Sequence, residues 1–509
     1  MATSSFQFVD FGKGLDLYTR DIKIKENEAA IATNVWSVGK NSLKKRPGYK
    51  LMAEVAGAGQ VDGIGTYYNA SVRELLVMAG GKLYKIESGT ATQIGSTTWT
   101  SGLKTDFCQA GGKLYIQNGT DALREYNGTT ITDTTNGKAG KACIFYKGSL
   151  WTFGNSANLT QLFRSGTDTS LGDFTYNVTT NPLATSVYVG KNDGQNITGL
   201  FKHQDYLYIT KENSIWSVSQ AIDESGTISL ELIDSSRGCV SHQTIDSVDN
   251  DIFFFNDVGM FAFGYEPNIT NQIRSNIVSL RVDPEIKTIQ KDRLDDIAGI
   301  YYDNHYYLSY TSGGASANDT ILNYDRQRLG WWKWNIGANC FSEYKGDDGY
   351  SRLYFGSSTD GKVYYFDETA KDDAGTAISS KWKSASFSFK DEVQQKFFHS
   401  LVLIFGKMSS DVTINVYIDG VLFTSVPGTF GRTGSGGIGT GAIGTKKIGV
   451  EKGSGTVADL GGGEKVHIPL NTMGATMQIE ITDTSLTKSW ELSTINGIMR
   501  PINKLYIKI

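Results

Sequence analysis

The sequence predicts an all-β protein: an irregular β-propeller of about seven blades, with an N-terminal extended arm before it and a C-terminal β-sandwich or jelly roll after it. Three observations lead to this prediction: a short phrase that recurs along the chain, an excess of aromatic residues and glycine, and a change of strand pattern after residue 373. Propeller blades are four-stranded sheets, and they repeat with a period of about 40–50 residues.

The recurring phrase is a polar or glycine turn followed by a hydrophobic residue and, usually, an aromatic one. The hydrophobic residues of its seven copies are Leu83, Leu114, Leu150, Leu207, Ile252, Tyr306 and Leu353. The intervals between them are 31, 36, 57, 45, 54 and 47 residues, with a mean of 45. The mean predicts propeller blades, and the uneven spacing predicts loops of different lengths between the strands. Irregular blades of this kind suit a part that is shaped to fit specific neighbours.

The composition favours strands. The chain has 26 Tyr, 24 Phe and 9 Trp beside 58 Gly and only 7 Pro among its 509 residues. Aromatic side chains suit half-buried pleated surfaces, and glycine provides the positive φ angles of tight hairpins. The formal net charge of −4 argues against a protein that coats nucleic acid or a membrane surface.

Targeting signals and paired cysteines are not evident in the sequence. No apolar run approaches the ~20 residues of a membrane span, and Met1–Asp10 lacks the basic and apolar regions of a signal peptide. We therefore expect a soluble protein that is made in a cytoplasm. The cysteines form no CxxC pair, so reduced thiols are expected rather than a zinc site or a disulfide framework. They are Cys108, Cys143, Cys239 and Cys340.

The first expected element along the chain is an extended arm, residues 1–50, in which isolated apolar residues alternate with polar stretches. Glu26–Trp36 is its one helical suggestion, because it contains several acceptable helix formers. Arms of this kind commonly add a strand to the last blade, in their own subunit or in a neighbour. Residues 51–373 are predicted to form the propeller, with a short helix at Pro284–Ile289 that begins at a proline.

The period stops in residues 374–509, where seven longer alternating segments predict a sandwich or jelly roll. Gly428–Gly463, inside this region, is too polar and too rich in glycine to pack a core. We expect it to be a long mobile hairpin tip.

Two glycine motifs come close to nucleotide-binding sequences. Gly356–Val363 has the spacing and the lysine of a P-loop, but Val363 replaces the Ser or Thr, and the segment joins two predicted strands. A hairpin with an Asp-Gly turn is therefore favoured. Gly439–Gly444 matches GxGxxG without a βαβ unit around it. We predict no catalytic residue, no cofactor and no metal site.

The histidines and carboxylates form no recognisable catalytic pattern. No HExxH or GxSxG motif occurs, and the histidines never pair at metal-ligand spacing. Two carboxylates from distant blades could still converge, as glycoside hydrolysis requires. We expect each histidine to be a strand or surface residue; they are His203, His242, His305, His399 and His467.

The tryptophan cluster of Trp331, Trp332 and Trp334 lies close in sequence to five tyrosines within residues 301–310. We predict blade-core aromatics, because alternating aromatics on strands fill the space between sheets. The alternative is an exposed platform on which sugars stack.

A basic triplet, Lys44, Lys45 and Arg46, stands just before a Pro-Gly turn. It is a candidate for contact with another subunit or with a phosphate backbone. A solvated turn is the alternative interpretation.

A set of phrases carries a resemblance to a known family. The set consists of Asn34-Val35-Trp36, Leu43–Gly48, Gly238–Ser241, Ile252–Met260, Leu322–Asp325, Trp331–Trp334, Gln478–Ile481 and Trp490–Leu492. Together they resemble bacteriophage tail nozzle proteins, also called packaged-DNA stabilisation or tail tubular B proteins. The first two resemble the family's amino-terminal signature, the middle four its propeller blades, and the last two its closing sandwich.

The resemblance implies a virion structural protein of the phage tail that is assembled in the host cytoplasm. Such nozzles form a homo-oligomeric ring, a hexamer, under the portal and adaptor, and other tail proteins such as fibres attach to it. Viral DNA crosses the ring without sequence-specific binding during ejection. Because DNA should slide rather than be gripped, we expect a bore lined by negative or neutral side chains. A related hub or ring of another tail type is equally compatible.

Two other functions stay open from the sequence. One is an enzymatic propeller that cleaves glycans on the host surface, and the other is a receptor- or glycan-binding module. The second would use the aromatic face or the Gly428–Gly463 segment.

Overall fold

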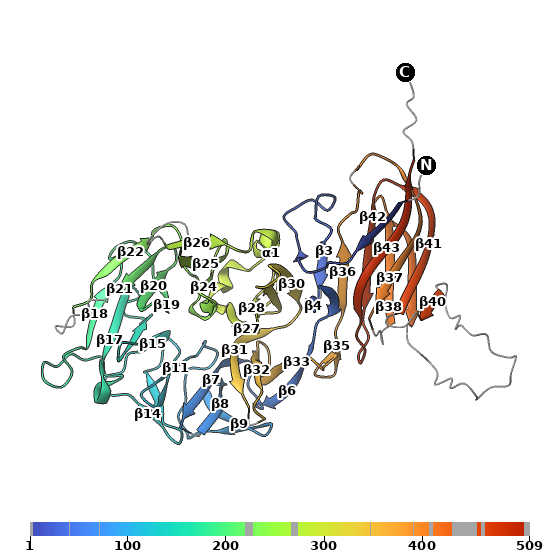
Figure 1. The fold of residues 1–509 in the computed structure, drawn as a ribbon. Coiled ribbons are helices and arrows are strands. Elements are labelled where there is room, and N and C mark those ends of the chain that lie inside the picture. Colours follow the sequence, from blue (N-terminus) through green and yellow to red (C-terminus); the bar gives the residue numbers. More distant parts are fainter. Residues whose placement is uncertain are drawn as a thin grey trace. The chain divides into compact units, whose positions relative to one another are not determined.

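The structure is a computed structural model, and it consists almost entirely of strands (Figure 1). It describes residues 4–39, 41–70, 72–218, 227–265, 273–346, 348–389, 391–406, 411–429, 456–459 and 464–502. Most of the predicted Gly428–Gly463 tip and all of the Gly439–Gly444 motif lie outside these residues.

The chain divides into two compact units, each described by itself. One unit, here the propeller unit, contains residues 50–322 and 336–366. The other, here the terminal unit, contains residues 1–49, 323–335 and 367–509. The predicted domain boundaries were 1–50, 51–373 and 374–509. The structure therefore differs in grouping the predicted arm and the tryptophan segment with the C-terminal residues.

The propeller unit contains four-stranded antiparallel sheets whose strands follow one another along the chain (Figure 1). The first two sheets are β7 (Val61–Asn69), β8 (Val72–Ala79), β9 (Lys82–Glu87) and β10 (Thr90–Gln93), then β11 (Asp106–Ala110), β12 (Lys113–Gln117), β13 (Arg124–Tyr126) and β14 (Ile131–Asp133). The next two are β15 (Ala142–Tyr146), β16 (Ser149–Phe153), β17 (Gln161–Thr167) and β18 (Thr185–Tyr188), then β19 (Ile197–His203), β20 (Tyr206–Lys211), β21 (Ile215–Val218) and β22 (Leu230–Asp234). Another is β23 (Asp246–Val248), β24 (Asp251–Asn256), β25 (Gly259–Tyr265) and β26 (Ile273–Ile277).

The chain then continues through β27 (Ala298–Tyr302), β28 (His305–Tyr310) and β29 (Thr320–Asp325), and it leaves the propeller unit within β29. It returns to form β31 (Ala338–Lys345), β32 (Ser351–Ser357) and β33 (Lys362–Asp367). The strand next to β33 is β6 (Gly48–Glu54), which precedes the first sheet in sequence. The amide of Val55, just after β6, donates to the carbonyl of Gly361 at 2.8 Å. A strand from the beginning of the same chain therefore completes the last sheet.

The first strands of successive sheets contact one another in a closed series. β7 contacts β11, β11 contacts β15, and β15 contacts β19. The 3-10 helix His242–Thr244 contacts both β19 and β27, β23 contacts β27, β27 contacts β31, and β31 contacts β7. Four-stranded meanders whose first strands close on themselves are the architecture of a β-propeller. The predicted all-β propeller is confirmed at this level.

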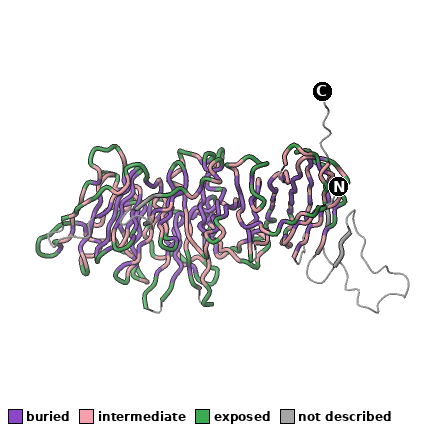
Figure 2. The backbone as a smooth tube through the Cα atoms, turned by 45° about the horizontal axis from the view of Figure 1, so that its top comes forward, coloured by how far each residue is buried: buried purple, intermediate pink, exposed green. Residues whose placement is uncertain are grey.

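Burial on both faces of the second strands explains the recurring phrase. Leu114 packs between the first and second sheets with Leu76 and Met78, whereas the next residue, Tyr115, packs between the second and third sheets with Leu150. Successive side chains of a strand point to opposite faces. Both positions are therefore apolar wherever a strand has a neighbouring sheet on each side. Figure 2 shows buried residues in the interior of the sheets and exposed residues at many of the turns.

One copy of the phrase is out of step with the others. Six copies enter the second strand of their sheet, but Gly81-Lys82-Leu83-Tyr84 enters β9, the third strand of the first sheet. The short first interval of the sequence pattern arises from this shift of one strand.

The terminal unit contains two sheets (Figure 1). In the first, the order is β4 (Val35–Val38), β5 (Ser42–Lys45), β43 (Glu491–Pro501), β37 (Lys396–Phe405), β41 (Glu464–Gly474) and β40 (Thr456–Asp459), with β1 (Ser4–Phe8) also paired to β43. In the second, the order is β30 (Gly330–Trp334), β2 (Gly14–Leu15), β3 (Glu28–Thr33), β36 (Ser380–Ser384), β42 (Met477–Asp483), β38 (Asp411–Ile418) and β39 (Val421–Thr429). A hairpin of β34 (Asp372–Asp373) and β35 (Thr376–Ala377) completes the unit.

Apolar side chains alternate with less buried ones along these longer strands, as the sequence pattern required. Val412, Ile414 and Val416 on β38 are fully buried, as are Leu401 and Leu403 on β37.

A residue without a side chain is needed at Gly14, where φ is +63° and an added Cβ would lie 2.2 Å from the carbonyl oxygen of Trp331.

The helix suggested at Glu26–Trp36 is wrong, because this segment forms β3 and β4. Ala32 in β3 pairs with Trp382 of β36, and Val35 in β4 pairs with Lys45 of β5. Asn34 separates the two strands with φ of 54°, a left-handed conformation that a helix cannot contain. Pairing on both sides has overridden a modest helix propensity. The short helix expected at Pro284–Ile289 is present as α1 (Asp283–Ile286), with the proline in its first turn.

Candidate functional site

The predicted basic triplet lies at a buried polar junction in the terminal unit. We use "polar junction" for Asn34, Lys45, Arg46, Asp373 and Asp483. The side chains of Lys45 and Asp483 are both 0 % exposed, and Arg46 is 1 % exposed. The prediction that Lys45 and Arg46 contact another subunit or a phosphate is therefore corrected, since both side chains have internal partners. Lys44 is half-buried on the same strand.

Lys45 is held by a complete set of acceptors. Its Nζ lies 3.1 Å from Oδ2 of Asp483 and donates to the carbonyls of Ser485 at 2.8 Å and Lys488 at 3.3 Å. Burial lowers the pKa of Lys45, and the Asp483 carboxylate opposes that shift. An ammonium group has three donors, so this set satisfies all of them.

Arg46 connects three separate segments of the terminal unit. Its Nη1 and Nη2 donate to the two carboxylate oxygens of Asp373 at 2.8 and 2.6 Å, and its Nε donates to Oδ1 of Asn34 at 2.9 Å. The same Asn34 oxygen accepts from the amide of Asn335 at 3.0 Å, and Asn34 Nδ2 donates to the carbonyl of Ser379 at 2.7 Å. Fork-to-fork pairing of this kind fixes orientation as well as distance.

The predicted aromatic cluster is buried. Trp331, Trp332 and Trp334 are 1 %, 0 % and 0 % exposed. Trp334 donates from Nε1 to the carbonyl of Val35 at 3.2 Å and packs edge-on against Trp36, with ring centroids 5.9 Å apart. Side chains this inaccessible are core residues, and they present no face on which a sugar could stack.

The other sequence motifs do not gather into a catalytic site in the described residues. Gly356–Val363 joins β32 to β33 as a strand–turn–strand hairpin, so the P-loop interpretation fails on context. The four cysteines are free and buried. No group of three or more His, Cys, Asp or Glu side chains in the described ranges could hold a metal ion. No helix in the same ranges is long and apolar enough to cross a membrane.

A cavity of about 310 Å³ lies among the first strands of the propeller unit. We call it the axial cavity, because these strands surround the axis of a propeller. Its polar lining includes Thr66, Asp106, Gln109, His242 and Gln243. No local sequence pattern predicts this site, because its residues come from five separate stretches of the chain.

A His–Asp pair faces the axial cavity. His242 accepts a hydrogen bond at Nδ1 from the amide of Leu200 at 3.3 Å, which places the proton of the neutral ring on Nε2. Nε2 lies 3.9 Å from Oδ1 of Asp106, beyond hydrogen-bond length. Burial lowers the pKa of His242 and raises the pKa of Asp106, and each group partly offsets the shift of the other. The expectation that His242 is a strand or surface residue is corrected, because His242 begins a 3-10 helix and lines the axial cavity.

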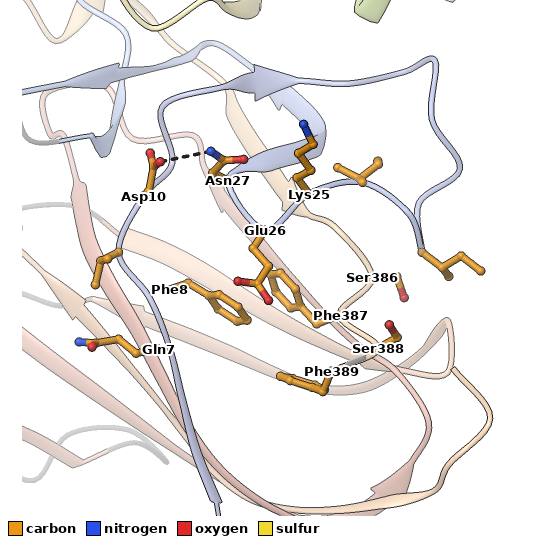
Figure 3. A pocket seen from close by; sticks show the side chains of 13 residues that line it. Gln7, Phe8, Asp10, Lys25, Glu26, Asn27, Ser386, Phe387, Ser388 and Phe389 are labelled. Carbon is orange, nitrogen blue, oxygen red and sulfur yellow. Dashed lines mark hydrogen bonds between the residues drawn. The ribbon is translucent and has the colours of Figure 1, made fainter. Parts of the chain in front are cut away.

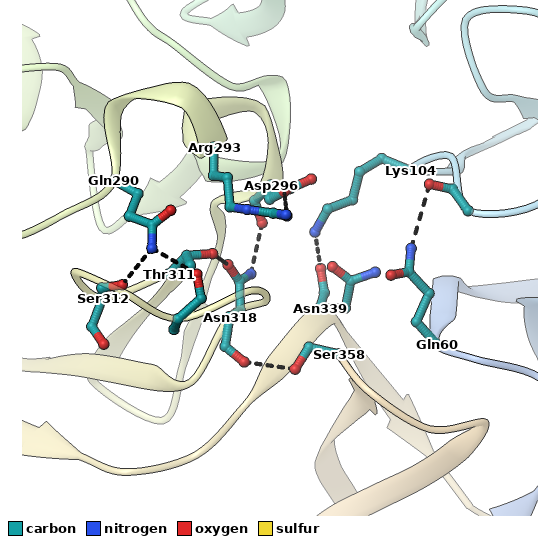
Figure 4. Close-up of polar contacts among 12 residues, drawn as sticks. Gln60, Lys104, Gln290, Arg293, Asp296, Thr311, Ser312, Asn318, Asn339 and Ser358 are labelled. Atoms are coloured by element: carbon teal, nitrogen blue, oxygen red, sulfur yellow. Dashed lines mark hydrogen bonds and ion pairs between the residues drawn. The ribbon is translucent and has the colours of Figure 1, made fainter.

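A charged cluster lies where the first strands begin, and Figure 4 shows its central side chains. Lys104 donates to the carbonyl of Asn339, and the carboxyls of Asp62 and Asp296 act on it electrostatically without a hydrogen bond. Burial lowers the pKa of Lys104 to about 8. Asp296 pairs with Arg293 at 3.1 Å. We call this set the axial charge cluster.

A second hollow, of about 580 Å³, lies in the terminal unit (Figure 3). The rings of Phe8 and Phe387 form part of its wall and stack with centroids 4.1 Å apart. Asp10 and Asn27 are joined across it by a 3.2 Å hydrogen bond. Its charged lining residues, Asp10, Lys25 and Glu26, carry both signs, so it favours no particular class of ligand.

Comparisons with known proteins give no family. No protein-family model matches the sequence, and no curated protein matches it. Among solved structures, the chain is similar to YCF48 from Cyanidioschyzon merolae at 9 % identity and a TM-score of 0.41, covering 63 % of this chain and 98 % of that one. It is also similar to BamB from Moraxella catarrhalis at 13 % identity and a TM-score of 0.37, covering 72 % and 98 %. A computationally designed protein, Ika8, matches at 10 % identity and a TM-score of 0.36, covering 62 % and 99 %.

Proposed function

We propose that the protein is a structural component of a bacteriophage tail. It is a nozzle or hub ring that continues the DNA channel below the portal and adaptor, retaining and then passing the genome. Six copies form the ring, other tail proteins including fibres bind to it, and viral DNA crosses its bore without sequence-specific contacts. It acts in the virion after assembly in the host cytoplasm, and it catalyses no reaction.

The proposal includes a finer architecture. The sheets that begin at β7, β11, β15, β19, β23, β27 and β31 are the seven blades of the propeller. Residues 1–50 act as an arm, and residues 374–509 form a β-sandwich. The closed series of contacts between first strands supports the blade count, and the alternating burial of β37 and β38 supports the sandwich.

The observation that carries the functional proposal is the use of the signature residues. Asn34, Lys45, Arg46 and Trp334 all belong to phrases that carry the family resemblance, and all four are buried. Their polar atoms bind one another, Asp373, Asp483 and nearby backbone groups. The most recognisable residues of the chain therefore hold its own segments together. Residues used in this way suit a rigid building block better than an enzyme.

The axial cavity argues against glycoside cleavage at that position. Hydrolysis of a glycosidic bond normally uses two carboxyl groups on either side of the bond. Asp106 is the one carboxylate among the residues that line the cavity. The enzymatic alternative would therefore need a different site.

The test is to purify the full chain, measure its mass by size-exclusion chromatography with light scattering, and image it by negative-stain microscopy. We expect rings with sixfold symmetry and an open bore. A higher-resolution map of the ring should show a bore lined by negative or neutral side chains.

Two outcomes would reject the proposal. Monomers or trimers that clear host polysaccharide would establish the glycan-cleaving alternative, and monomers that bind polysaccharide without clearing it would establish a receptor-binding module. A ring whose bore is lined by lysine and arginine would overturn the sliding mechanism while leaving the ring itself in place.

A further inference from the structure

The axial cavity combines polar groups of both kinds. His242 can donate from Nε2, because its Nδ1 is already an acceptor. Gln109 accepts from the amide of Tyr68 through Oε1 at 3.3 Å, so the donors on its Nε2 are the part available to a ligand. Asp106 and the hydroxyl of Thr66 add acceptors.

Gln243 supplies an acceptor whose hydrogen bond is missing. Its Oε1 is buried and has no hydrogen-bond partner among the described residues, while its Nε2 lies 3.5 Å from the carbonyl oxygen of Thr105. A buried acceptor without a hydrogen-bond partner destabilises the folded chain. A hydroxyl group that reaches this oxygen from the cavity would supply the missing hydrogen bond.

The distance between His242 and Asp106 also favours a ligand with hydroxyl groups. At 3.9 Å the ring and the carboxylate do not bond to each other directly. A hydroxyl group placed between them could accept from Nε2 and donate to the carboxylate at once, because a hydroxyl is both a donor and an acceptor.

Apolar surface completes the wall. Phe107, Phe341, Ile64 and Ile245 are among the residues that line the cavity, whose lining is mostly polar. Phe107 can lie flat against β7 because Gly65 has no side chain, and a Cβ there would come within 2.4 Å of the ring. Rigid apolar faces beside converging donors and acceptors are typical of small-molecule sites.

We propose that the axial cavity binds one neutral polyhydroxy molecule of the size of a monosaccharide. Its volume of about 310 Å³ is at the lower end of the range for ligand pockets, roughly 300–1,000 Å³. An anion is disfavoured by Asp106, and a cation is disfavoured by the donors of His242 and Gln109. Hydroxyl groups satisfy both kinds of lining atom, because each is a donor and an acceptor.

The test is calorimetric titration of the purified full chain, in whatever assembly it adopts, with D-glucose, D-galactose, D-mannose and N-acetyl-D-glucosamine. D-Glucosamine and D-glucuronate serve as charged comparators. We expect saturable binding of at least one neutral sugar, one molecule per chain, and weaker binding of its charged analogue.

Two variants locate the site. Gln243→Leu and Asp106→Asn should each weaken binding about tenfold or more, as expected for the loss of a hydrogen bond in a buried site. Gln93→Leu is the matched control, because Gln93 is exposed on β10, and its binding should be unchanged. Far-ultraviolet circular dichroism and thermal melting establish that each variant is folded, and having two variants keeps the test valid if one of them does not fold.

The inference is overturned if the folded wild-type chain binds none of the four neutral sugars, if binding survives both cavity substitutions, or if a charged comparator binds more tightly than its neutral parent. None of these results bears on sixfold ring formation, which is measured separately by mass and imaging.

Discussion

Two lysines, Lys45 and the half-buried Lys104, show how differently the two units use charge. Lys45, in the terminal unit, is fully enclosed and has a carboxylate and two carbonyls within hydrogen-bond distance. Lys104, in the propeller unit, bonds to one backbone carbonyl, and its neighbouring carboxyl groups act on it only at a distance. A fully enclosed ammonium group with a complete set of partners fixes structure, whereas a half-buried one with an incomplete set loses its proton more readily.

The same contrast extends to the surrounding side chains. At the polar junction, every polar group of Arg46 and Asn34 has a partner that binds it from a different segment. At the axial cavity, the Oε1 atom of Gln243 has no hydrogen-bond partner among the described residues, and no direct hydrogen bond joins His242 to Asp106. The junction is thus the structural centre of the terminal unit, and the axial cavity is the part of the propeller unit suited to bind something.

Asp483→Ala should have the largest effect on stability. The substitution leaves the Lys45 ammonium buried without its carboxylate, and loss of one partner from a buried pair costs about 3–5 kcal/mol. Urea denaturation followed by tryptophan fluorescence measures the free energy of unfolding. A loss below about 1 kcal/mol would show that Lys45 is not enclosed as described.

Trp334→Ala should also destabilise the terminal unit strongly. The side chain is fully buried against Trp36, so removal leaves a large cavity and costs roughly 3–5 kcal/mol. The expected readout is a lower melting temperature in calorimetry. An unchanged melting temperature would place this side chain at the surface and would restore the sugar-platform hypothesis.

Lys104→Met should change how stability depends on pH. The folded pKa of Lys104, about 8, lies below its ordinary value of 10.5. The unfolded chain therefore holds more protons between pH 8 and 10.5, and wild-type stability should rise over that window relative to the variant. We expect the relative gain to be about 1–2 kcal/mol, because the half-buried Lys104 side chain is partly screened by solvent. Urea denaturation of both proteins at pH 7.5 and pH 10 provides the measurement. A difference that stays constant with pH would contradict the prediction.

Asp360→Ala should have the smallest effect on stability of these substitutions. Asp360 and Lys362 form a 3.2 Å pair on the β32–β33 turn, with side chains that are 41 % and 33 % exposed. Pairs this exposed contribute little to stability. The same denaturation assay should show a change far smaller than that of Asp483→Ala, and a loss comparable to that of Asp483→Ala would mean that exposure does not separate the two kinds of pair.

The sequence predicted the propeller because its repeating signal is local. A turn followed by two buried residues reports that a strand has a neighbour on each face, and Leu114 with Tyr115 illustrates this directly. The signal cannot report which strand of the sheet it marks, and so the copy at Leu83 marks a third strand whereas the other copies mark a second strand. The prediction for Glu28–Thr33 was wrong for a related reason: pairing with β2 and with β36, which is distant in sequence, decides the conformation of this segment.

The candidate sites were less predictable than the fold. Lys45 and Arg46 look like surface residues beside a turn, because their partners Asp373 and Asp483 lie more than 300 residues away along the chain. His242 and Asp106 are ordinary in their local sequence. Only the closing of successive sheets into a ring places them 3.9 Å apart. The spacing of residues within a local motif therefore cannot predict that these two side chains are neighbours.

The strand β6 has a consequence for how the protein is made. It belongs to the last sheet, yet about 300 residues separate it from its partner β33. On the ribosome, the edge of β6 that pairs with β33 stays without this partner until nearly three quarters of the chain has been synthesised. Contacts of such long range are slow to form, and exposed strand edges invite pairing with other chains. Completion of the propeller should therefore be the late step of folding, and nascent chains that stall before residue 362 should be especially prone to aggregate.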